Sequence, residues 1–154
     1  MKVKLWVNGK HQLWEIAPDE RLSGALRAHG YPSVKTGCDQ GACGLCTVWV
    51  DEKPVPSCSY LAARAEGRHI TTLEGVQEEA ARYGKLLVAE GADQCGYCAP
   101  GLIMLVLALK RELKNPDEEK IKAYLNGNIC RCSGYYGQIR AAVNYLQTDT
   151  EQGL

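Results

Sequence analysis

Alternating apolar and polar residues open the chain and predict a β-hairpin. Residues 2–16 read KVKLWVNGKHQLWEI, and the Asn8-Gly9 pair within them favours a tight turn between two strands. Two more runs, residues 47–51 and residues 69–75, are rich in the apolar and β-branched residues that strands favour. These strands predict a small sheet in the first half of the chain.

Two helical segments interrupt these strands. Pro18-Asp19 is expected to open a short helix that ends at Gly30, with Leu22, Ala25 and Leu26 on one face. Residues 59–67, SYLAARAEG, predict one or two further helical turns. Together with the strands, they predict a small mixed α/β domain.

From about Val76 the apolar positions recur at helical spacing. Helices are expected over residues 77–90, from Pro100, from Asn115 to Asn126, and from Gly137 to the C-terminal region. In the third, Asn115 is the expected cap, with Pro116 at the first helical position and acidic residues after it. The apolar face of the last helix is assigned to Ile139, Ala142, Val143 and Leu146. Four helices packed as a bundle follow from this pattern.

Length and composition agree with two small globular units. The chain has 154 residues, of which 45% are hydrophobic and 23% charged. We predict an α+β protein, with one domain over residues 1–75 and a helical domain over residues 76–154. The formal net charge of +0 gives no reason to expect a nucleic acid or an anionic membrane as a partner. The apolar run at residues 101–109 is shorter than the roughly 20 residues that a membrane span needs, and the N-terminal residues lack a secretory pattern. We therefore expect a cytoplasmic protein.

Eight cysteines divide evenly between the two halves. In a reducing compartment, cysteines in such a pattern are metal ligands more often than disulfides. The first set lies in the first half and the second set in the helical half: Cys38, Cys43, Cys46 and Cys58, then Cys95, Cys98, Cys130 and Cys132. Four plus four leaves none over, which indicates two four-thiolate sites.

The first set has the spacing C-x4-C-x2-C followed by a distant cysteine, as in plant-type [2Fe–2S] ferredoxins. Gly37, Gly41 and Gly44 bracket the ligands. Residues without a Cβ let the backbone wrap closely around a cluster and direct N–H groups at the sulfurs. Cys58 follows the expected hairpin TVWVDEKPVP and would supply the fourth thiolate.

The second set has the spacing C-x2-C and then C-x-C, with both pairs in loops that precede helices. A disulfide between Cys130 and Cys132 is disfavoured, because residues two apart rarely meet disulfide geometry. Two helix N-termini would face one site and stabilise an anionic cluster. On this hypothesis Cys130 and Cys132 bind one iron, or adjacent irons, of a second [2Fe–2S] cluster.

Three other interpretations fit the cysteine pattern less well. Zinc sites built from two cysteine pairs favour C-x2-C on both sides, which C-x-C does not match. A disulfide scaffold does not suit the expected compartment. A Rieske arrangement needs histidine ligands, whereas His11, His29 and His69 lie apart from the cysteine motifs.

Three motifs, GCDQGACGLCTV, QCGYCAPG and GNICRCSGY, resemble the small iron–sulfur subunit of the xanthine oxidase family of molybdenum hydroxylases. The resemblance covers essentially the whole chain. It implies an N-terminal β-grasp ferredoxin-like domain, a C-terminal four-helix domain and a [2Fe–2S] cluster in each. It also implies a large molybdopterin-binding subunit and a medium FAD-binding subunit, and the expected assembly is a dimer of such heterotrimers.

The resemblance further implies roles for individual residues. The second cluster (Cys95, Cys98, Cys130, Cys132) would lie near the molybdopterin, with Cys132 closest to it and Gln94 hydrogen-bonded to the pterin. The first cluster (Cys38, Cys43, Cys46, Cys58) would lie nearer the flavin. Ala99 and Ser133 stand where threonine is expected and Leu45 where alanine is usual, but none of these differences removes a ligand.

On this basis the chain is an electron-transfer subunit that is not catalytic alone. The molybdenum centre would hydroxylate a carbon, and electrons would leave singly through the two clusters to the flavin. Purines (xanthine-like) are the first expectation for the substrate, while other N-heterocycles such as nicotinate, aldehydes, carbon monoxide and aromatic thioesters stay open. The rival functions are a free-standing two-cluster ferredoxin or redox sensor and a zinc-held interaction domain.

Overall fold

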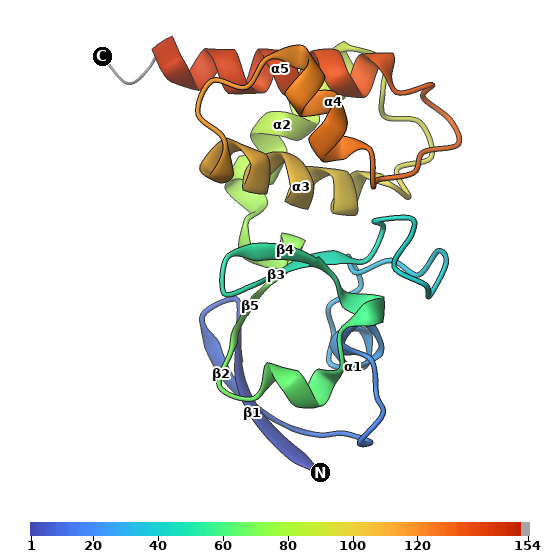
Figure 1. The fold of residues 1–154 in the computed structure, drawn as a ribbon, viewed down its shortest axis with the longest axis vertical. Coiled ribbons are helices and arrows are strands. Elements are labelled where there is room, and N and C mark those ends of the chain that lie inside the picture. The colour runs from blue at the N-terminus through green and yellow to red at the C-terminus, as the bar shows by residue number, and fades with distance from the viewer. Residues whose placement is uncertain (152–154) are drawn as a thin grey trace.

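The computed structural model describes residues 1–151, with side chains described to residue 148. In this part of the chain a five-stranded sheet forms one layer and four longer helices form another (Figure 1). The α+β class is therefore confirmed. No helix within residues 1–151 is long and apolar enough to span a bilayer.

The sheet has the strand order β2-β1-β5-β3-β4. Its strands are β1 (Lys2–Val7), β2 (Lys10–Glu15), β3 (Thr47–Val50), β4 (Lys53–Pro56) and β5 (His69–Thr71). β1 and β5 run parallel, while the other neighbouring strands are antiparallel. Asn8 and Gly9 have φ of 51° and 77°, the left-handed conformations that a two-residue hairpin turn needs. The expected hairpin is confirmed.

The short helix α1 (Leu22–Ala28) covers this sheet. Two 3-10 turns, Ser57–Ser59 and Ala62–Ala65, lie between β4 and β5, and a third, Leu73–Gly75, follows β5. The expectation that Pro18 opens α1 was wrong, because residues 18–19 form a turn and the helix begins four residues later. The strand expected over residues 69–75 also ends early. The N–H of Thr72 donates to the side chain of Asn8 at 2.9 Å, so it is not available to extend the strand ladder.

The second layer consists of α2 (Gln77–Ala89), α3 (Ala99–Glu112), α4 (Glu118–Leu125) and α5 (Tyr136–Glu151). These confirm the four expected helices. The predicted cap of α4 was wrong: Asn115 has a φ of 46°, whereas a capping residue adopts an extended backbone. Asp117 caps the helix instead, and its carboxylate accepts the N–H of Lys120 at 2.8 Å.

The buried face of α5 differs by one residue from the predicted face. Its fully buried positions follow the same helical spacing but begin one residue earlier: Gln138, Ala141, Ala142 and Tyr145. Ile139, Val143 and Leu146 pack at the margin of the core and are only partly buried. The predicted face was chosen from apolar residues alone, whereas the buried face begins at the polar Gln138.

Each layer has its own hydrophobic core, which supports our proposal that residues 1–75 and 76–154 are separate domains. Leu5, Leu26 and Ile70 belong to the first core, and Tyr83 and Leu107 to the second.

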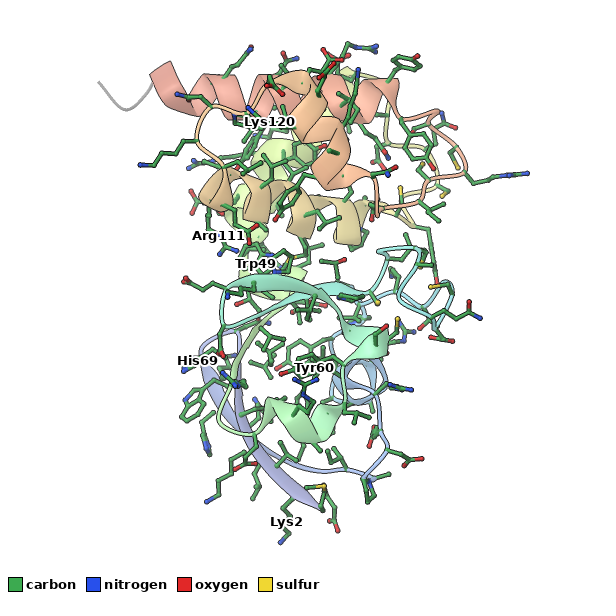
Figure 2. The ribbon with its side chains drawn as sticks, viewed as in Figure 1. Lys2, Trp49, Tyr60, His69, Arg111 and Lys120 are labelled. Atoms are coloured by element: carbon green, nitrogen blue, oxygen red, sulfur yellow. The ribbon has the colours of Figure 1, made fainter. Side chains whose placement is uncertain are left out.

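Trp49 of β3 joins the two domains by packing into the helical core. Its indole N–H donates to the carbonyl of Met104 at 2.9 Å, and the Arg111 guanidinium lies 3.5 Å from its ring centroid (Figure 2). α3 therefore lies directly against β3 (Figure 1).

Candidate metal centres

The first cysteine set lies in the loop between α1 and β3 and in the 3-10 turn after β4. Backbone N–H groups in this loop point at sulfur. Gln40 donates to the Cys38 thiol at 3.4 Å, and Gly41 donates to the Cys58 thiol at 3.3 Å. Gly41 has a φ of 73°, and a Cβ on it would lie 2.4 Å from the Ser59 hydroxyl. A glycine is therefore required where the loop folds over the site.

The four thiols of this set meet as two pairs. Cys38 contacts Cys43, and Cys46 contacts Cys58. The N–H of Gln40 and the contact with Cys43 lower the pKa of Cys38 to about 7. Burial raises the pKa of Cys46 to about 11. Because thiolates are the metal-binding form, iron must displace the proton of Cys46 on binding.

The second set lies in the loops that precede α3 and α5, and its four thiols line one small cavity. Ala99 and Gln138 also line it, so the first turns of both helices border the site, as expected. Positive helix ends suit an anionic cluster. Gln94, the predicted pterin contact, is exposed at the rim of the same cavity.

These thiols also form two pairs, which differ in exposure. Cys98 and Cys130 contact each other on the inner side, where Cys130 is buried. Cys95 and Cys132 contact each other and are both exposed. A [2Fe–2S] cluster has two protein ligands on each iron. If each contacting pair held one iron, Cys130 and Cys132 would bind adjacent irons.

The inner pair receives side-chain hydrogen bonds that the sequence did not predict. The hydroxyl and the N–H of Ser133 donate to the Cys130 thiol at 3.2 and 3.4 Å. Gln138 Nε2 donates to the Cys98 thiol at 3.5 Å. Burial raises the pKa of Cys98 to about 11. Burial would raise the pKa of Cys130 as well, but hydrogen bonds from Ser133, from the N–H of Cys132 and with Cys98 together lower it to about 7.

The contacting thiol pairs do not match a structural zinc site. All eight cysteines are free thiols. Among the side chains described, residues 1–148, no three His, Cys, Asp or Glu side chains lie close enough together to hold one metal ion. The observed pairs suit a two-iron cluster, whereas structural zinc takes four ligands around one ion.

The two sites lie close together, on the same side of the molecule (Figure 1). The N–H of Ile129 donates to the carbonyl of Cys43 at 2.9 Å, which joins the residue before Cys130 to a residue of the first set. Gly44 and Gly101 allow this approach. A Cβ on Gly44 would lie 2.4 Å from the Gly127 carbonyl oxygen, and one on Gly101 would lie 2.4 Å from that of Gly44. The sequence shows these glycines, but not that they meet.

Two known families match the two halves of the chain. The family described as "2Fe-2S iron-sulfur cluster binding domain" matches residues 6–73, and "[2Fe-2S] binding domain" matches residues 72–144. Each cysteine set lies within one match. These matches contradict the zinc-held interaction domain and confirm two [2Fe–2S] domains.

Similar proteins cover nearly the whole chain. The nicotinate dehydrogenase small FeS subunit of Eubacterium barkeri is 41% identical over 146 residues, which is 93% of this chain and 92% of that protein. The xanthine dehydrogenase iron-sulfur-binding subunit of Escherichia coli O157:H7 is 44% identical over 144 residues, 86% of each. A crystal structure of quinoline 2-oxidoreductase from Pseudomonas putida 86 superposes with a TM-score of 0.90 at 32% identity, covering 99% of this chain and 97% of that one. The chain therefore belongs to the small [2Fe–2S] electron-transfer subunits of the molybdenum hydroxylases, the family of xanthine dehydrogenase, aldehyde oxidoreductase and nicotinate dehydrogenase.

Proposed function

We propose that this chain carries electrons from a molybdopterin centre in a large partner subunit toward FAD in a medium partner subunit. The cluster ligands in this proposal are the two sets Cys95, Cys98, Cys130, Cys132 and Cys38, Cys43, Cys46, Cys58. When bound, each [2Fe–2S] cluster supplies a one-electron redox centre. The assembly is a cytoplasmic dimer of heterotrimers, and this chain contributes no catalytic residue.

The hydrogen bond from Ile129 to Cys43 is the observation that carries this proposal. It joins a ligand of the first set to the residue before Cys130 in the second set, at 2.9 Å. Covalent bonds and this one hydrogen bond then make a continuous route between the two sites. Tyr97 adds a second connection, because its hydroxyl donates to the Thr36 carbonyl at 2.8 Å. Such a route suits a protein that conducts electrons from one domain to the other.

Exposure supports the proposed direction of flow. In the second set Cys95 and Cys132 are open to the surface while Cys130 is buried, and we assign this outer pair to the side of the molybdopterin partner. Gln94 lies beside this pair, and its amide can both donate to and accept from a pterin edge. Exposed apolar side chains also lie in the two loops that carry these cysteines and at the start of α5: Tyr97, Ile129, Tyr135 and Tyr136. Exposed apolar patches are typical of protein interfaces.

Gly44→Ala should disturb the contact between the two cluster loops. Gly44 has a φ of 70°, and the added Cβ would meet the Gly127 carbonyl oxygen. The backbone penalty is about 1–2 kcal/mol, and the clash comes in addition. We therefore expect a lower melting temperature and a weaker magnetic interaction between the two reduced clusters.

Gly67→Ala is the matched control. Gly67 also has a φ of 70°, but nothing lies within 4 Å of its Cβ position. It should lose stability through the backbone penalty alone and keep the magnetic interaction. Equal behaviour of the two variants in melting and in low-temperature electron paramagnetic resonance (EPR) would contradict the proposed contact.

For the substrate we propose a purine of the xanthine type. Two relatives that match most of this chain are named as xanthine dehydrogenase subunits, one of them as probable, although others are named for nicotinate and nicotine. The purified complex should hydroxylate xanthine with a higher kcat/KM than nicotinate or benzaldehyde. A higher value for either competitor would reject the purine proposal and leave the electron-transfer function intact.

A further inference from the structure

Gln138 is a polar residue in a core position beside the second cysteine set. It lies in the first turn of α5 and is 3% exposed. Its neighbours on the same buried face are Ala141, Ala142 and Tyr145. An apolar side chain would fill this position without the cost of burying an amide. The buried amide therefore indicates a specific hydrogen-bonding role.

The position of Gln138 is fixed from the backbone side. Its carbonyl accepts the hydroxyl of the fully buried Tyr83 at 3.1 Å. Gly137 packs closely against the end of α2, since a Cβ there would lie 2.9 Å from the Glu90 carbonyl oxygen and from the Ala92 side chain. The start of α5 therefore holds the side chain of Gln138 in one place.

The Gln138 amide is directed at a predicted cluster ligand. Its Nε2 lies 3.5 Å from Cys98 Sγ, and Cys98 belongs to the inner thiol pair. Ser133 donates hydrogen bonds to the other thiol of that pair, Cys130. Each inner sulfur thus has a side-chain donor.

We propose that Gln138 raises the reduction potential of the helical-domain cluster by donating a hydrogen bond to Cys98 Sγ. The inference rests on the proposed function, because it assumes a [2Fe–2S] cluster on the second cysteine set. Adding one electron makes the cluster more negative, and a donor to a ligand sulfur stabilises that state more than the oxidised state. Gln138 therefore makes this cluster the better electron acceptor.

Gln138→Met tests the proposal, since methionine is similar in length and has no donor. In a redox titration of the full chain followed by EPR, the ratio of reduced to oxidised helical-domain cluster at a fixed potential should fall about tenfold. This corresponds to about 59 mV for a one-electron couple. The potential of the ferredoxin-like cluster should not change.

Asn144→Met is the control, because it removes an amide from α5 that donates to Glu90 and not to a thiol. Both potentials should stay at their wild-type values. An unchanged helical-domain potential in Gln138→Met would overturn the inference. A wild-type chain without a second cluster signal would instead overturn the proposed function.

A second measurement covers the case in which Gln138→Met does not assemble its cluster. The chain is labelled with 15N-glutamine and carries Gln94→Ala, so that Gln138 supplies the glutamine side chain near the second cysteine set. Pulsed EPR of the reduced helical-domain cluster should then show a 15N hyperfine coupling. Absence of this coupling would reject the hydrogen bond itself.

Discussion

Cys130→Ser should abolish the reduced-state EPR signal of one cluster and leave the signal of the other cluster present, without the magnetic interaction between them, and Cys43→Ser should do the reverse. The two residues belong to sets that come from separate loops and border separate cores. Serine lacks the soft thiolate that these clusters require. The link between the sets uses the backbone carbonyl of Cys43, which the substitution retains. Iron content should fall from about four per chain to about two in each variant.

Each variant is the control for the other, because each removes one buried thiol. Far-ultraviolet circular dichroism should show that both chains remain folded. If either folded variant lost both signals, the division into two independent four-thiolate sites would be wrong. Colourless wild-type protein with stoichiometric zinc would reject the clusters altogether.

Local signals explain which parts of the fold were predictable. The Asn8-Gly9 pair specifies its own turn through backbone conformation, and the glycines around the first cysteines reflect close backbone packing. Features that depend on distant partners were missed. The strand predicted over residues 69–75 ends where the Asn8 side chain accepts the N–H of Thr72. Nothing near Thr72 in the sequence indicates this hydrogen bond.

The candidate sites show the same division. Cysteine spacing predicted two sets of four and the helix starts around the second set. It did not predict the pairing of Cys98 with Cys130 and of Cys95 with Cys132, because pairing depends on how two loops meet. Gln138 was missed for a related reason: a polar side chain on a helix face is normally assigned to solvent. If the predicted apolar face of α5 had begun one residue earlier, it would have included Gln138.

Removing the helical-domain cluster should stop electron flow through the whole complex, and this is the largest functional effect we expect. Cys95 and Cys132 are exposed on the face assigned to the molybdopterin subunit. The backbone contact between Ile129 and Cys43 leads from there to the first set. If this is the route, Cys130→Ser breaks it at its start and Cys43→Ser breaks it beyond the first acceptor.

Rapid-freeze EPR of the assembled complex, mixed with substrate, tests the central claim most directly. The variants are compared at equal molybdenum content, so that lost reduction does not reflect lost cofactor. The account predicts that Cys130→Ser leaves the ferredoxin-like cluster and the flavin oxidised, whereas Cys43→Ser still allows the helical-domain cluster to become reduced. The opposite pattern, with the ferredoxin-like cluster filling when the helical-domain cluster is absent, would contradict it.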